Sequence, residues 1–252
     1  MAIDIGKMKQ KLNALHTKGG GSTTKFWKTP NGESVIRIVP TQDGDPFKEF
    51  HFHYNVGGEN GFLCPKKNFG DECKVCEFVS ALYKGSEEDK VNARKLVSKQ
   101  RFVSPILVRG EEDKGVQLFS YSKSVYETLL QLVINPDYGD ISDSEEGIDL
   151  VLTYGKAPGA MFPTTTVTPR RRSSPIVSDK RQRDELLSVN VDFANLFERK
   201  SPDQVAQALD RFLSGDDGEA VDGSDGVPEK EVKYAGSASK SAVDEAFDDL
   251  LK

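Results

Sequence analysis

Residues 53–76 read HYNVGGENGFLCPKKNFGDECKVC and place one histidine and three cysteines within 24 positions. His53 is followed after ten residues by Cys64, after eight more by Cys73 and after two more by Cys76. Tetrahedral zinc takes four such nitrogen and sulfur ligands. Because a site with four protein ligands has no place for an activated water, we predict one structural zinc ion that joins a hairpin to the helix behind it.

His51 is an alternative to His53 as the nitrogen ligand. Residues 50–54 alternate as in a β-strand, which puts both imidazoles on one face. We favour His53 and keep His51 open. Buried thiols beside a core histidine, or a redox-active Cys-x-x-Cys, are weaker interpretations, because a third cysteine and two nearby histidines suit coordination better.

The segments around this stretch predict an α+β fold that is mainly β. We expect strands at 35–39, 50–54, 102–108, 116–121 and 148–154, and helices at 77–96 with a break at 84–86, at 125–134 and after Ser201. Ser201 and Gln204 form a capping-box pattern for the last helix. For residues 156–175, rich in Thr, Pro and Arg, we expect a long surface loop.

The two ends of the chain differ from its centre in charge. Residues 1–28 hold six lysines against one acid, and 4–16 have the spacing of a short basic amphipathic helix that ends in glycines, so we expect a flexible basic N-terminal arm. Residues 215–252 hold eleven acids against four lysines, a net −7, which leaves about +1 of the total −6 for residues 1–214. We expect a disordered acidic C-terminal tail.

The last residues of the tail, 241–251, have the pattern of a docking peptide for other proteins. An apolar stripe interrupted by acids follows a possible helix cap at Ser241. The candidate partner-binding residues are Val243, Phe247, Asp248, Asp249, Leu250 and Leu251. Since no apolar run approaches the length of a membrane span and the start lacks the apolar stretch of a signal peptide, we expect a soluble intracellular protein.

Basic and aromatic residues interleave around the predicted strands, as a surface for single-stranded nucleic acid requires. The candidates are Arg94, Lys95, Lys99, Arg101, Phe102, Phe119, Tyr121, Lys123, Arg170, Arg171 and Arg172. Trp27, Phe50 and Phe52 we assign instead to packing of the core or the arm. No metalloprotease motif, paired carboxylates in a metal-ligand pattern or phosphate-cradling glycine motif accompanies them, so we expect no catalysis.

The order of these features resembles the single-stranded DNA-binding, helix-destabilising protein of T-even-like bacteriophages. The most specific part of the resemblance is the His53, Cys64, Cys73, Cys76 spacing, supported by the tail ending at 247–251. The resemblance implies an OB-fold barrel in residues 23–214 with an inserted zinc-binding subdomain at about 50–98. It also implies an arm, 1–22, whose Lys7, Lys9 and Lys11 mediate cooperative self-association along the strand.

The same resemblance implies a role in coating and protecting single-stranded DNA during phage DNA replication, recombination and repair, in the cytoplasm of the infected bacterial host. Replication and recombination proteins are the implied partners of the tail. Two alternatives remain open from the residues. The chain could be a protein-interaction module built on the zinc knuckle, or it could bind single-stranded RNA, because stacking and phosphate contacts do not distinguish the sugar.

Overall fold

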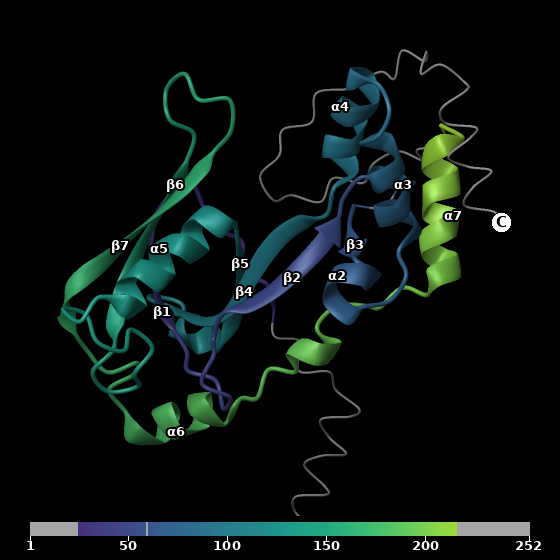
Figure 1. Cartoon of the computed structure of the whole chain (residues 1–252). Helices are drawn as coiled ribbons and strands as arrows, with labels where there is room; N and C mark the ends of the chain where they lie inside the picture. Colours follow the sequence, from purple (N-terminus) through teal and green to yellow (C-terminus); the bar gives the residue numbers. More distant parts are fainter. Residues whose placement is uncertain (1–24, 59, 216–252) are drawn as a thin grey trace, which may run out of the picture.

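The computed structural model describes residues 25–58 and 60–215 (Figure 1). The predicted arm helix at 4–16, with Lys7, Lys9 and Lys11, lies outside the described residues. So do the six candidate partner-binding residues of the tail. None of the helices in the described part is long and apolar enough to cross a membrane.

One antiparallel sheet organises the structure. Its strands are β1 (Gly32–Ile38), β2 (Lys48–His53), β3 (Phe62–Leu63), β4 (Lys99–Val108), β5 (Gln117–Tyr121), β6 (Ile148–Gly155) and β7 (Thr164–Ser173). Their order is β3-β2-β4-β1-β6-β7, and β5 pairs with β4. The pairings between named strands are antiparallel. The expectation of a mainly β fold with several helices is therefore confirmed.

The main core lies where β1, β4, β5 and β6 meet α5 (Lys123–Ile134). Ile36, Ile38, Phe102, Phe119 and Leu150 are among its buried side chains. Each strand contributes β-branched or aromatic residues, which suit a pleated surface with one buried face. Beside this core, α6 (Lys180–Ser188) packs Leu186 and Leu187 against a smaller cluster.

A second core surrounds the cysteines. It is formed by α2 (Pro65–Phe69), α3 (Lys74–Leu82), α4 (Glu87–Leu96) and α7 (Pro202–Leu213). Phe62, Phe78 and Leu96 are buried there with Val205 and Leu209 of α7, and Figure 1 shows α7 lying beside α3. The C-terminal helix is thus packed on the cysteine-bearing part, which the sequence did not indicate.

The start of α7 and its contact with the hairpin are both sharply specified. The predicted capping box is confirmed, because the Ser201 side chain accepts from Gln204 N and the Gln204 side chain accepts from Ser201 N. Gly57 has a φ of +61°, and a Cβ there would lie 2.1 Å from the carbonyl oxygen of Ala208. Only glycine allows the β2–β3 turn to approach the α7 backbone this closely.

The prediction of a loop over residues 156–175 is wrong for its second half. Residues Thr164–Ser173 form β7, a hairpin partner of β6. Its first part, residues 164–168, consists of four threonines and one valine, β-branched residues that favour an extended chain. Pro169 is tolerated because β7 is the last strand in the sheet order, where a missing N–H donor breaks no ladder on the outer side.

Candidate metal centre and nucleic-acid interface

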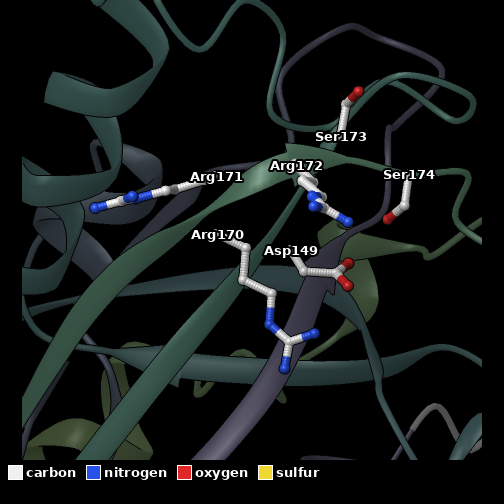
Figure 2. A pocket seen from close by; sticks show the side chains of 6 residues that line it. All are labelled: Asp149, Arg170, Arg171, Arg172, Ser173 and Ser174. Carbon is white, nitrogen blue, oxygen red and sulfur yellow. The ribbon is translucent and has the colours of Figure 1, made fainter.

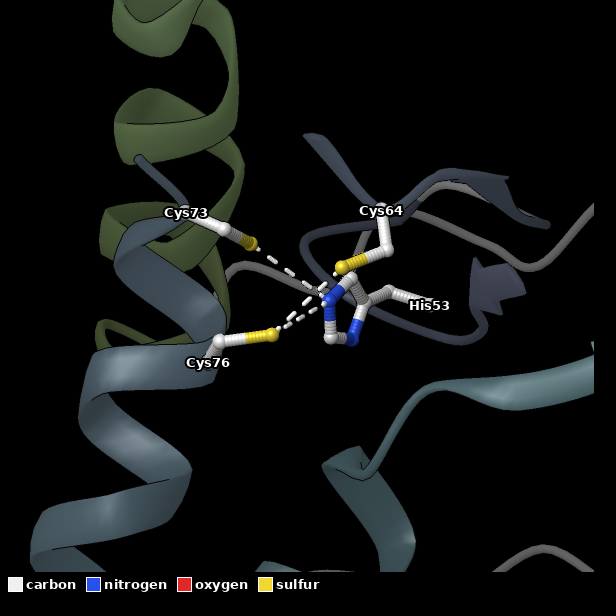
Figure 3. Close-up of side chains that lie close together, drawn as sticks. All are labelled: His53, Cys64, Cys73 and Cys76. Atoms are coloured by element: carbon white, nitrogen blue, oxygen red, sulfur yellow. Dashed lines mark hydrogen bonds between the residues drawn. The ribbon is translucent and has the colours of Figure 1, made fainter. Parts of the chain in front are cut away.

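Four potential metal ligands converge from three short elements (Figure 3). His53 is the last residue of β2, and Cys64 follows β3 as the N-cap of α2. Cys73 is the N-cap of α3, and Cys76 lies in its first turn. The Cys-x-x-Cys spacing therefore brings two sulfur atoms to one end of a helix, while the hairpin supplies the other two ligands.

The geometry of this cluster fits a metal ion. The ligand atoms lie within 4.8 Å of one another. His53 Nε2 is 3.5 Å from Cys73 Sγ and 3.4 Å from Cys76 Sγ, and the Sγ atoms of Cys64 and Cys76 are 3.4 Å apart. Tetrahedral zinc with bonds of about 2.3 Å to sulfur separates its ligands by about 3.8 Å. The cluster can thus hold a four-coordinate ion with small adjustments of the side chains.

His53, and not His51, joins the three cysteines. Its buried ring donates from Nδ1 to the carbonyl oxygen of Leu96 at 2.9 Å, which leaves Nε2 facing the sulfur atoms. Such a second hydrogen bond fixes the tautomer and the ring orientation of a metal ligand. His51 instead places Nε2 3.5 Å from a carboxylate oxygen of Glu49.

The protonation states of the four side chains in the cluster depend on one another. Burial disfavours the charged form of His53, but contacts with the thiols of Cys64 and Cys73 outweigh this and raise its pKa to about 9. Hydrogen bonds with Cys73 and Cys76 lower the pKa of Cys64, and those with Cys64 and Cys73 raise the pKa of Cys76. Three sulfurs and a ring nitrogen compete here for protons that a bound divalent cation replaces.

The opposite face of β2 carries rings beside cations. In the antiparallel register, Phe50 of β2 lies opposite Arg101 of β4, and Phe52 lies opposite Lys99. Residues directly opposite one another share a face of the sheet. All four side chains are half-buried or exposed. We call this set, Phe50, Phe52, Lys99 and Arg101, the β2–β4 face.

Phe50 and Phe52, which the sequence assigned to packing of the core or the arm, are half-buried and pack with Phe197, and their position beside cations makes them additional candidates for a binding role. Strand alternation contains the signal that could have found them. If His53 points to the metal, then Phe50, Phe52 and Tyr54 point away from it. The ligand cluster lies on one face of β2. The row of aromatic residues on the other face is therefore a candidate for a surface role.

Three rings expected to stack on bases lie in the core instead. Phe102, Phe119 and Tyr121 are 1%, 2% and 3% exposed. Phe102 stacks on Tyr126 with ring centroids 3.8 Å apart. The hydroxyl of Tyr121 is 2.7 Å from that of Ser104, and burial raises its pKa. No face of these rings is open to a base, which corrects the expectation for them.

The other basic candidates outside β7 lie on different helices. Arg94 and Lys95 are exposed in the last turn of α4, and the Nζ of Lys99 lies 3.4 Å from the Arg94 carbonyl oxygen. Lys123 is exposed at the start of α5 and lies 3.6 Å from Glu127. The Lys99 ammonium group thus lies at the C-terminal end of α4, the helix that carries Arg94 and Lys95.

The arginine triplet lies in an irregular part of β7. The register with β6 shifts between Ile148 and Leu150, so that residues 170–172 are opposite Asp149. Arg170, Arg171 and Arg172 are all exposed there and line a pocket with Asp149. Figure 2 shows the side chain of Arg171 extending away from that of Arg172. A bulge of this kind re-aims side chains, and it separates the triplet into two directions.

A buried ion pair fixes the backbone next to this bulge. Arg37, which is 0% exposed, contacts Asp149 at 3.0 Å and donates to the carbonyl oxygen of Ser174 at 2.8 Å. Arg109 reaches the same carboxylate at 2.8 Å and donates to the carbonyl oxygen of Ile176. Burial lowers the pKa of Arg37, an effect that Asp149 opposes. The network joins β1, β4 and β6 to the chain after β7.

These features define a protein built on an antiparallel sheet, with a cluster of one histidine and three cysteines that is compatible with a metal ion. Residues 30–214 match the family model described as gp32 DNA binding protein like. That match covers more than half of the chain, and the chain therefore belongs to this DNA-binding protein family. It confirms the resemblance found in the sequence. No curated protein matches the chain significantly.

Proposed function

We propose that this chain is a non-catalytic protein that binds and coats single-stranded DNA through the β2–β4 face. The observation that carries the proposal is the register that sets Phe50 beside Arg101 and Phe52 beside Lys99. Aromatic ring faces accept bases of any identity, at about 1–3 kcal/mol each, and the neighbouring cations neutralise phosphates. The family match supports DNA as the polymer.

The metal has a structural role in this proposal. Three sulfur ligands and one nitrogen favour zinc, and four protein ligands leave no open position for a substrate. The ion would hold the end of β2 against α2 and α3. Since β2 carries Phe50 and Phe52, it would also fix the position of the rings relative to β4. We propose that the sheet forms an OB-type barrel, with the metal-binding part at about 50–98 as an insertion in a 23–214 core.

The ends of the chain complete the proposal. Lys7, Lys9 and Lys11 of the arm would contact the neighbouring protein on the strand. The acidic tail, 215–252, would dock replication and recombination proteins through its last residues. From the family, we propose that the protein works in phage DNA replication, recombination and repair in the cytoplasm of the infected host. Arg170, Arg171, Arg172 and Lys123 would add phosphate contacts outside the β2–β4 face.

The decisive experiment compares binding of the full chain to a single-stranded oligonucleotide and to its duplex across a salt series. We expect a clear preference for the single strand and an affinity that falls steeply with salt. Binding to oligo-rU, measured in the same experiment, tests the alternative that the chain binds single-stranded RNA. Equal binding to duplex and single strand, or no binding, would refute the proposal and leave the protein-interaction module as the better reading.

A further inference from the structure

One connecting segment crosses the β2–β4 face. Residues 189–201 join α6 to α7, and Figure 1 shows this stretch, with its short helix η2 (Phe193–Asn195), passing close to β2. At the start of β2, the Nζ of Lys48 lies 5.8 Å from the centroid of the Phe193 ring. At the far end, Arg199 stacks on Phe69 of α2 with its Cζ 4.4 Å from the ring centroid.

Between these two contacts, Phe197 lies against Phe50 and Phe52, the two rings that we call the aromatic strip of the β2–β4 face. Its ring centroid is 5.0 Å from that of Phe50 and 4.9 Å from that of Phe52, with interplanar angles of 76° and 85°. It also lies 5.6 Å from Phe26. A base that stacks on Phe50 or Phe52 needs room beside the ring, and Phe197 packs against both rings at contact distance.

The segment is held by contacts that can be exchanged. Its residues are exposed or half-buried. The backbone hydrogen bonds of Val189 and Phe193 run to Leu186 and Val191, their close neighbours in sequence. Arg199 forms an exposed ion pair with Asp71, a kind of contact that contributes little to stability and is screened by salt. The ring contacts of Phe197 with Phe50 and Phe52 are T-shaped, and a base that stacked on those rings would replace them.

We propose that Phe197 occupies, in the free protein, the place that an unpaired base takes on Phe50 and Phe52, and that strand binding displaces residues 189–201. The inference rests on the proposed function, since it assigns the β2–β4 face to bases. The segment then protects two half-exposed rings when no DNA is present. Each binding event exchanges an internal ring contact for a contact with the strand.

The Phe197→Ala variant of the full chain tests the sign of this exchange. Removing an internal competitor should tighten binding to oligo-dT, by about threefold to tenfold. Phe193→Ala is the matched control, because it removes a ring of the same segment beside Lys48 and away from the strip; its affinity should stay near that of the natural chain. If Phe197→Ala weakens binding or leaves it unchanged, Phe197 is not a competitor and the proposal is overturned.

Hydrogen exchange on the unaltered chain gives an independent readout. Amides of residues 190–200 should exchange faster when oligo-dT is bound, because the segment leaves the strip. Unchanged or slower exchange would overturn the displacement. Phe50→Ala distinguishes a failure of the proposed β2–β4 binding face from a failure of the displacement alone. If it leaves oligo-dT affinity unchanged, the proposed β2–β4 face fails. If it weakens binding while Phe197→Ala also weakens it, only the displacement fails.

Discussion

Phe50 of β2 and Arg101 of β4 are direct partners across an antiparallel register, so ring and guanidinium leave the sheet on the same side. The next residue of β4, Phe102, points the other way and is 1% exposed in the main core. One step along a strand thus separates the proposed nucleic-acid surface from the core packing that holds the sheet together.

This separation predicts opposite outcomes for two phenylalanines. Phe50→Ala should lower the affinity for single-stranded DNA by about 1–3 kcal/mol and change the free energy of unfolding little. Phe102→Ala should destabilise the fold by about 3–5 kcal/mol, because it leaves a cavity in the core. Denaturant titration and fluorescence anisotropy with oligo-dT measure the two effects. A strongly destabilised Phe50→Ala would place that ring in the core and contradict the assignment.

The cations beside the rings should act through phosphates. We expect Arg101→Ala to weaken binding to all single-stranded sequences alike and to reduce the slope of log affinity against log salt by about 0.7. Lys114→Ala is the control, because Lys114 is exposed, pairs with Glu111 and follows the opposite end of β4. Isothermal titration over a salt series gives the slopes. An unchanged slope in Arg101→Ala would mean that the strand does not reach this face.

The two histidines of β2 should differ in metal content. His53→Ala removes one of four ligands and should lose stoichiometric zinc, whereas His51→Ala should retain it, since His51 lies beside Glu49. Elemental analysis of the purified variants makes the comparison. Chelation of the natural chain should unfold the cluster around α3 and α4, visible as lost helical circular dichroism. Full zinc in His53→Ala would shift the ligand role to another residue.

The cysteine spacing predicted the ligand cluster well, because ligands close in sequence leave few ways to fold around one ion. Strand alternation and apolar periodicity predicted the hairpin and the helices now seen as α3 and α4, and the Ser201–Gln204 pattern predicted the capping box, whereas α2 was not predicted. The prediction of which rings stack on bases was wrong. Phe102, Phe119 and Phe50 are chemically alike, and only the strand register decides which of them lie on the solvent side of the sheet. The loop prediction was also wrong for residues 164–173. The proline and arginines there are not typical of a strand, and the strand forms because it pairs with β6.

The buried carboxylate of Asp149 should matter far more than an exposed one. Asp149→Asn leaves Arg37, 0% exposed, without its charged partner, and should cost about 3–5 kcal/mol of unfolding free energy. Glu145→Gln removes the exposed partner of Arg183 and should cost under about 1 kcal/mol. Urea denaturation of both variants measures the difference. Equal, small effects would show that the arginines find other partners.

Removal of the acidic tail should tighten binding to DNA. Residues 216–252, which lie outside the described structure, carry eleven acids, and an acidic segment joined to the same chain competes with phosphates for Lys99, Arg101 and their neighbours. We expect a chain ending at residue 215 to bind oligo-dT more tightly at low salt. The difference should shrink as added salt screens the tail from the β2–β4 face. An unchanged or weaker affinity at matched ionic strength would contradict this competition.

Because the tail is proposed to act by charge and Phe197 by ring contacts, the gain in affinity from Phe197→Ala should persist at salt concentrations where the gain from truncation has disappeared.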